Sequence, residues 1–314
     1  MKTKTYTKIN TLYQRYMNLN KVDLPNPKWK AFQNKIILGV FSDDYMEYIK
    51  ELKFDCFSKI DGTNSKIVYY PSTGKCFPSG KSDSADIVNN GQGEFLNKII
   101  ETIKPKLAEL FPKESAKFVP VVGDDNKVQY YTPSIEIANY GTMAVKGDVV
   151  ENIGPYDYMV ELTEDPVYIY GEFFGKKIQK GGNYDKDNNR FNVFDICIQG
   201  WYIPVDMLKE YCDTLGLDLV PYIGRMTLSE AEEMVKTGFK TRVPNVSNPD
   251  YMEEGIVARP VVPIKNPRGK RIIVKIKTCD YMDLQRAIDN VGVEEYKKFH
   301  SWYMDNKKQI ESIE

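Results

Sequence analysis

Lysine and carboxylate side chains in three separated stretches of the sequence have the chemistry needed to act on a phosphate. Lys59 precedes an Asp-Gly pair in SKIDGTN, and Glu254 precedes a glycine and an apolar run in EEGIV. Lys275 and Lys277 alternate with apolar residues in VKIK. A neutral lysine amine is a nucleophile, while carboxylates hold Mg²⁺ or Mn²⁺. Each stretch taken alone also fits an ordinary surface turn or a half-exposed strand.

The two lysines of VKIK are expected to share one face of a strand. Side chains two residues apart on a strand point to the same side of the sheet, so Lys275 and Lys277 would project together. The opposite face would carry apolar side chains that pack on the core, namely Ile272, Val274 and Ile276.

Composition excludes several other kinds of chemistry. The chain has 314 residues and a single histidine, His300, so a Ser-His-Asp or Cys-His device is improbable. The formal net charge is −1, which predicts no general attraction to polyanions. Between Lys265 and Lys277, however, six Lys or Arg residues occur without an acid. This local basic strip is compatible with phosphate binding at one site.

The remaining bulk features indicate a globular protein of one large or two ordinary domains. No run of 18 apolar residues occurs, and the basic N-terminus lacks the apolar core of a secretory signal. The five cysteines are scattered without CxxC spacing, which favours a reducing compartment. We therefore expect a cytoplasmic monomer with no membrane contact, in the host cytoplasm if the gene belongs to a phage.

Strands are predicted to dominate the middle of the chain. Two hairpins are expected, residues 65–70 with 74–81 and residues 118–123 with 127–131. Runs of β-branched and aromatic residues predict further strands at 167–174, 190–198 and 271–277.

Helices are predicted to be fewer. Apolar residues at helical spacing indicate helices at 204–217 and 227–238, the second opened by a Thr-x-x-Glu capping box. Another helix is expected within 85–110, and 281–314 is expected to be mostly helical. The predicted class is α+β, with antiparallel sheets flanked by helices.

Five motifs occur in a fixed order along the chain: KxDGxN, YGE, VFDI, EEGIV and VKIK. With these motifs the sequence resembles the covalent nucleotidyltransferases, the superfamily of ATP-dependent DNA ligases, RNA ligases and mRNA capping enzymes. It is most similar to the RNA ligases of T-even phages and of trypanosome RNA editing. The resemblance covers roughly residues 35–280 and includes GEFFGKKIQKGGNYDKDNNRFNVFDI. It implies an ATP-grasp-like adenylation domain at 1–280, with an insertion at about 112–166 and a short helical tail at 281–314.

The resemblance also implies residue roles. Lys59 would attack ATP to form lysyl-AMP, and the other catalytic residues would be Asp61, Glu254, Lys275 and Lys277. Glu254 and Asp61 would hold Mg²⁺ or Mn²⁺, and the partner would be RNA with 5′-phosphate and 3′-hydroxyl ends. Glu172 would bind the ribose and Phe194 would stack on the adenine. The nucleotide-binding residues would be Ser58, Thr63, Asn64, Lys81, Glu172 and Phe194.

The proposed nucleophile must lose a proton before it can attack. An ordinary lysine is almost fully protonated at pH 7, and reversing this costs roughly 4–5 kcal/mol. Neighbouring cations and a bound metal ion lower that cost. Lys275 and Lys277 would supply the cations, and would also stabilise charge on the α-phosphate and the leaving pyrophosphate.

Two departures from the family pattern leave alternatives open. Asp61 stands where the phage and editing ligases often have His, and Lys81 stands where relatives generally have Arg, which forms a bidentate fork that lysine lacks. Asn64 favours an RNA ligase, because DNA ligases and capping enzymes usually have Arg there. The alternatives are a DNA ligase, a GTP-dependent capping-type enzyme, or an inactive nucleic-acid-binding relative.

Overall fold

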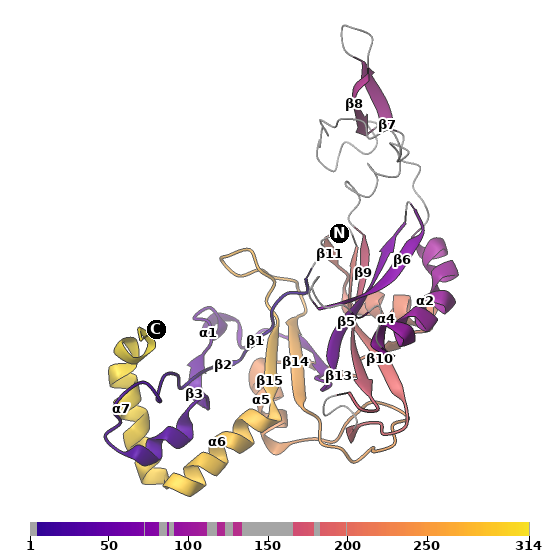
Figure 1. Cartoon of the computed structure of the whole chain (residues 1–314). Helices are drawn as coiled ribbons and strands as arrows, with labels where there is room; N and C mark the ends of the chain where they lie inside the picture. The colour runs from indigo at the N-terminus through magenta and orange to yellow at the C-terminus, as the bar shows by residue number, and fades with distance from the viewer. Residues whose placement is uncertain are drawn as a thin grey trace. The chain divides into compact units, whose positions relative to one another are not determined.

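The computed structural model describes residues 5–71, 73–81, 87, 91–111, 118–122, 128–133, 166–178, 183–198 and 200–313. The chain folds into two compact units, each assembled from separate segments, and Figure 1 follows their elements by colour. Unit 1 consists of Met1–Thr5, Thr63–Phe173 and Arg190–Leu219. Unit 2 consists of Tyr6–Gly62, Phe174–Asn189 and Val220–Glu314.

A five-stranded sheet forms the centre of unit 2. Its order is β1-β15-β14-β4-β13. The strands are β1 (Asn10–Thr11), β15 (Val274–Lys277), β14 (Gly255–Pro260), β4 (Phe54–Ser58) and β13 (Tyr222–Met226). All neighbours are antiparallel except β1, which pairs in parallel with β15. Segments far apart in sequence therefore meet at β14 and β15.

Helices and a small ribbon complete unit 2. The ribbon consists of β2 (Tyr13–Arg15) and β3 (Ile36–Phe41), and the short helices are η1 (Pro27–Phe32) and α1 (Met46–Ile49). The longer helices are α5 (Leu228–Thr237), α6 (Thr278–Val291) and α7 (Val293–Glu311). Helix α5 packs on β14 and β15, and α6 packs on β15, η1, α5 and α7.

Aromatic side chains from both ends of unit 2 form part of its core. Phe299 of α7 is fully buried and stacks on Phe32 of η1 at a centroid distance of 4.6 Å. Its ring also lies 4.7 Å from that of Tyr16 and 5.6 Å from that of Trp29. The C-terminal helix is thus a component of this core rather than an appendage.

Unit 1 is built on a second sheet with the order β11-β10-β9-β5-β6, and β12 adds to β10. Hairpin strands β5 and β6 pair antiparallel, as do β5 and β9. Helix α2 (Gly91–Leu110) packs on β5, β6 and α4 (Val205–Leu215). The strands are β5 (Thr63–Tyr70), β6 (Lys75–Gly80), β9 (Val167–Gly175), β10 (Asn189–Ile198), β11 (Trp201–Tyr202) and β12 (Asp218–Leu219).

The predicted α+β class and most of the predicted elements are confirmed. The hairpin of β7 (Phe118–Val122) and β8 (Val128–Pro133) is present, while most of 112–166 lies outside the described residues. Helix α5 begins with the expected capping box, in which Thr227 accepts from the Glu230 amide and the Glu230 carboxylate accepts from the Thr227 amide. The strand predicted at 271–277 is shorter, because β15 spans only Val274–Lys277. The domain limit predicted at residue 280 stays a prediction.

Candidate active site

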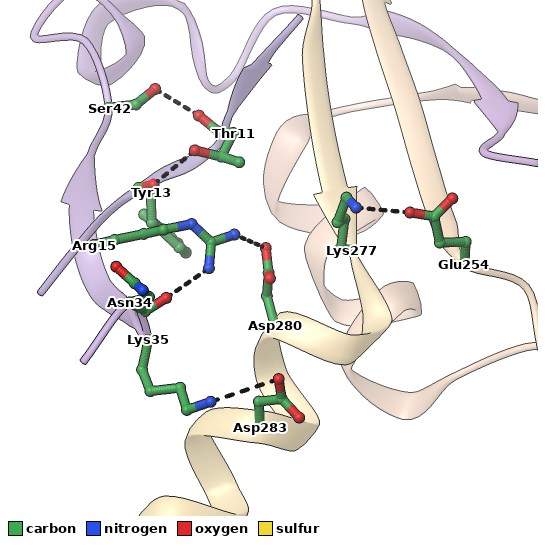
Figure 2. A network of polar contacts seen from close by, with 10 residues as sticks. All are labelled: Thr11, Tyr13, Arg15, Asn34, Lys35, Ser42, Glu254, Lys277, Asp280 and Asp283. Carbon is green, nitrogen blue, oxygen red and sulfur yellow. Dashed lines mark hydrogen bonds and ion pairs between the residues drawn. The ribbon is translucent and has the colours of Figure 1, made fainter. Parts of the chain in front are cut away.

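One carboxylate joins two lysines at the ends of neighbouring strands in the sheet of unit 2. Lys59 Nζ lies 2.5 Å from Glu254 Oε2, and Lys277 Nζ lies 2.7 Å from Glu254 Oε1. The Glu254 side chain is only 14% exposed, so water screens these two ion pairs weakly. We call Lys59, Glu254 and Lys277 the lysine–glutamate cluster; Figure 2 shows Glu254 and Lys277 in it.

The sheet explains why these three residues meet. Lys59 follows the last residue of β4, and its amide donates to the Gly255 carbonyl at 2.9 Å. Gly255 begins β14 and pairs with Lys277 at the end of β15. The cluster therefore sits where three adjacent strands begin or end.

Gly255 is required by a close approach of two strands. Its φ is +152°, and an added Cβ would lie 2.0 Å from the carbonyl oxygen of Ile276. No larger residue fits this position without moving β15 away from β14. The glycine that follows Glu254 therefore sets the spacing between Glu254 and Lys277.

The two lysines of β15 lie in opposite electrostatic environments. Burial lowers the pKa of Lys275, and the positive charges of Lys277 and Lys59 lower it further. Burial also acts to lower the pKa of Lys277, but its bond to Glu254 outweighs this and the net pKa is raised. Both half-buried lysines share one face of β15, while Val274 and Ile276 are buried on the other, as predicted.

A polar network from the N-terminal segment supports β15. Thr11 of β1 pairs with Lys275, and the Leu12 amide donates to the Lys275 carbonyl at 3.3 Å. Arg15 of β2 forms an ion pair of 2.6 Å with Asp280, which lies in the first turn of α6 (Figure 2). Arg15 also contributes to the lowered pKa of Lys275.

A second glutamate lies buried beside the cluster. Glu253 is 1% exposed and accepts a hydrogen bond of 2.7 Å from the Tyr184 hydroxyl. Burial raises the pKa of the Glu253 carboxyl, and the hydrogen bond from the Tyr184 hydroxyl offsets this only in part. Ser58, which the sequence predicted as nucleotide-binding, has a buried side chain in this arrangement.

In unit 1, the predicted nucleoside-binding residues share one face of a sheet. Asn64 pairs with Glu172 across β5 and β9, and Lys66 pairs with Tyr170. Paired residues point to the same side. The ring of Phe194 on β10 is nearly parallel to that of Tyr170, at a centroid distance of 6.5 Å. Lys66 is 1% exposed, and the sequence did not single it out.

Three predicted site residues lie in other positions. Thr63 is the first residue of β5 and pairs with Phe173, on the face opposite to Asn64. Lys81 lies directly after β6 and is exposed. Asp61 is half-buried between β4 and β5, and its amide lies near the Tyr184 hydroxyl. The roles predicted for these residues stay predictions.

The donor atoms suit a divalent cation only in part. Carboxylate oxygens such as those of Glu254 are the ligands that Mg²⁺ and Mn²⁺ prefer. Within the described residues, no group of three or more His, Cys, Asp or Glu is placed to hold a metal ion. A cation at Glu254 would therefore require additional oxygen ligands from a bound phosphate.

The sequence analysis did not single out Glu253 or Asp280, which lie close to the cluster in the chain and are bonded to Tyr184 and Arg15. Glu253 was visible only as the first of two consecutive glutamates, and Asp280 as an acid three residues after Lys277. Nothing in the sequence links Arg15 to Asp280 or Tyr184 to Glu253, since 265 and 69 residues separate these partners.

Comparison with known proteins adds a family match. Residues 54–277, well over half of the chain, match the family model described as RNA ligase. The chain has no significant match among curated proteins. None of the described helices is both long and apolar enough to cross a membrane.

Two solved structures illustrate the similarity. A mutant Naegleria gruberi RNA ligase with ATP and Mn has 14% identity and a TM-score of 0.44, over 76% of this chain and 53% of that chain. The Naegleria gruberi RNA ligase with PPi has 13% identity and a TM-score of 0.45, over 90% of this chain and 65% of that chain. The chain thus spans between about half and two thirds of the length of these relatives.

Proposed function

The chain belongs to the RNA ligase family, and from that premise we propose that it joins RNA 3′-hydroxyl and 5′-phosphate ends with ATP, through lysyl-AMP at Lys59. The lysine–glutamate cluster is the observation that carries this proposal. The family match spans the whole cluster, from β4 to Lys277. The KxDGxN motif, with Asn64 in place of Arg, favours an RNA ligase over a DNA ligase or a capping enzyme.

The first step is attack by the Lys59 amine on the α-phosphorus of ATP. A nitrogen–phosphorus bond forms, the bond to pyrophosphate breaks, and the lysine ammonium passes two of its three protons to solvent. Glu254 holds Lys59 in place, while Lys275 and Lys277 stabilise charge on the α-phosphate and on the leaving pyrophosphate. Mg²⁺ or Mn²⁺, held by Glu254 with Asp61 and the nucleotide phosphates, would supply further charge neutralisation.

Two further displacements at phosphorus complete the reaction. In the second step, an oxygen of the RNA 5′-phosphate attacks the phosphorus of lysyl-AMP, and the nitrogen–phosphorus bond breaks to release Lys59. In the third step, the 3′-hydroxyl attacks the activated 5′-phosphate, a phosphodiester forms and AMP leaves. The three displacements build up similar charge, so the same cations can serve each of them.

Nucleoside recognition is assigned to the face of unit 1 that carries Glu172 and Phe194. A glutamate can accept hydrogen bonds from both ribose hydroxyls. An aromatic ring stacks on any base, so Phe194 supplies affinity without choosing adenine. Asn64 lies opposite Glu172 and adds donor and acceptor groups at the same place.

Covalent labelling tests the proposal. The protein is incubated with ATP labelled at the α-phosphate and Mg²⁺ or Mn²⁺, then separated under denaturing conditions. We expect ATP-dependent label on the wild type and on Lys53→Ala, an exposed lysine control in unit 2. We expect no label on Lys59→Ala.

Other outcomes have definite meanings. Labelling by GTP alone would replace the proposal with a capping-type activity. If neither nucleotide labels the protein, intact mass before and after incubation with pyrophosphate tests for AMP already attached. An unmodified mass in that case would overturn the proposal.

A further inference from the structure

The loop between β14 and β15 concentrates positive charge that the proposed ATP chemistry does not use. Lys265, Arg268 and Lys270 are exposed on it, Arg271 follows at its end, and the sequence has no acid from Val261 to Ile273. Within the described part of the chain, no ion pair involves Lys265, Arg268 or Lys270. We call these three residues with Arg271 the basic loop. Figure 1 shows the loop extending beyond the ends of both strands.

The basic loop is an ordered turn. The Asn266 carboxamide oxygen accepts hydrogen bonds from the amides of Arg268 at 3.0 Å and Lys270 at 2.9 Å. The Asn266 amide donates to the Lys270 carbonyl at 2.7 Å, and the Gly269 amide donates to the Asn266 carbonyl at 2.8 Å. These bonds use backbone groups and one asparagine, so the exposed side chains of Lys265, Arg268 and Lys270 are left to face solvent.

The base of the loop is anchored to the core of unit 2. Ile272 and Ile273 are 5% and 3% exposed, and the Ile272 amide donates to the Ile264 carbonyl at 3.2 Å. The Val261 amide donates to the Lys53 carbonyl at 3.1 Å. Cations held on a fixed platform lose less conformational entropy when they bind an anion than cations on a flexible tail.

The position of the loop indicates which phosphates it meets. Gly255 and Lys277 lie at one end of the β14–β15 hairpin, and the loop lies at the other. Five residue steps along β14 from Gly255 to Pro260 cover about 17 Å. The basic residues lie beyond Pro260, so at the 3.4 Å rise of a B-form strand the loop is at least about five nucleotides from the cluster. The loop is thus suited to polynucleotide phosphates several residues from the reacting end, rather than to the phosphates of ATP.

We infer that the basic loop is a docking surface for the RNA backbone, at least about five nucleotides from the ends being joined. This inference rests on the proposed function for the identity of the polyanion. Phosphate contacts fix register without reading sequence, so the loop would contribute affinity and positioning to RNA of any sequence. It also explains how a protein with a net charge of −1 can bind a polyanion.

Charge removal in the loop provides the test. The loop variant is Lys265→Ala/Arg268→Ala/Lys270→Ala, which leaves the backbone hydrogen bonds of Asn266 intact. The control variant is Lys53→Ala/Lys240→Ala/Lys297→Ala, which removes the same charge from exposed lysines that are each paired with an acid. The probe is a fluorescent 5′-phosphorylated single-stranded RNA of 20 nucleotides, titrated at several KCl concentrations.

The expected result separates RNA binding from ATP chemistry. Three lost phosphate contacts lower the slope of log affinity against log salt by about 2 for a single strand. We expect that change, and weaker RNA binding, in the loop variant alone. We expect both variants to label with ATP at the wild-type rate. With an RNA too short to span the distance from the lysine–glutamate cluster to the loop, we expect the loop variant and the wild type to ligate at the same rate.

Several results would overturn the inference. An unchanged salt slope in the loop variant would do so, and so would an equal change in the control variant, which would indicate a general charge effect. Loss of ATP labelling in the loop variant would assign the loop to the nucleotide or to folding. If the wild type neither labels with ATP nor carries AMP by intact mass, the proposed function fails, but the RNA titration still decides whether the loop binds the backbone.

Discussion

At the scale of single residues, Glu254 balances Lys59 and Lys277, while Lys275 is left among like charges. The folded protein therefore binds a proton at Lys275 less tightly than the unfolded chain does. The charge on Lys275 therefore destabilises the folded state at neutral pH. This destabilisation disappears as the pH rises from the lowered pKa of the folded state to the pKa of the unfolded chain, near 10.4.

We expect Lys275→Met to raise the melting temperature at pH 7 by about 1–2 °C and to lose this gain by pH 10. We also expect labelling with ATP to slow about a hundredfold, because one cation at the phosphate is lost. Lys277→Met is the matched control, and we expect it to lower the melting temperature at pH 7. The raised pKa of Lys277 means that its charge stabilises the folded state at pH 7, and this stabilisation is lost as the pH rises through that raised pKa. Equal shifts in both variants would contradict this account.

The buried carboxyl of Glu253 predicts a second pH effect. Its pKa is raised, so the folded state holds the proton more tightly than the unfolded chain does. The stability that this provides is lost as the pH rises from the ordinary glutamate pKa, near 4.3, through the raised pKa of the folded state. We expect Glu253→Gln to flatten the fall in the free energy of unfolding between pH 4 and pH 8, measured by urea denaturation. Tyr184→Phe keeps the carboxyl and removes its hydrogen bond, which should cost about 1–3 kcal/mol. If the free energy of unfolding falls with pH equally in Glu253→Gln and in the wild type, the Glu253 carboxyl is not the source of this pH dependence.

At the scale of elements, the spacing of β14 and β15 depends on Gly255. We expect Gly255→Ala to abolish ATP labelling, because the new Cβ would meet the Ile276 carbonyl and separate Glu254 from Lys277. The backbone conformation alone should cost about 1–3 kcal/mol of stability. Gly91→Ala is the control, since an added Cβ there meets nothing within 4 Å. The measurements are labelling at low temperature and thermal unfolding, and a fully active Gly255→Ala would show that the spacing is not needed.

Elements defined by local pattern were predictable from the sequence, while the contacts between elements were not. Alternation in VKIK and the Thr227–Glu230 capping box depend on neighbours within a few residues, and both are present. The parallel addition of β1 beside β15 joins residues 264 positions apart. A single sequence carries no signal for such a pairing, because neither strand alone specifies its partner.

At the scale of the whole molecule, the C-terminal helix α7 is part of the core of unit 2. We expect Phe299→Ala to lower the free energy of unfolding by about 3–5 kcal/mol, because a large ring packed against Tyr16, Trp29 and Phe32 is lost. Met304→Ala on the same helix, at a site 38% exposed, should change it by less than about 0.5 kcal/mol. Denaturant unfolding compares the two, and similar losses would mean that α7 is not anchored by its aromatic face.

The two-unit division shows a second limit of sequence reasoning. The chain passes from one unit to the other after Thr5, Gly62, Phe173, Asn189 and Leu219. Two of these crossings lie inside continuous strands, β9 and β10, where no turn or linker residue marks a boundary. At these two crossings the division left no local trace from which it could be predicted.

The ion pair between Lys59 and Glu254 has an electrophoretic consequence. In the proposed first step, the formally positive Lys59 would become lysyl-AMP, which has an uncharged nitrogen and one negative phosphate. This proposed step would lower the formal net charge by two from its starting value of −1. On a protein so close to neutrality, this change is large enough for ion exchange to separate the two forms without a label. The separation would show directly what fraction of the purified protein already carries AMP.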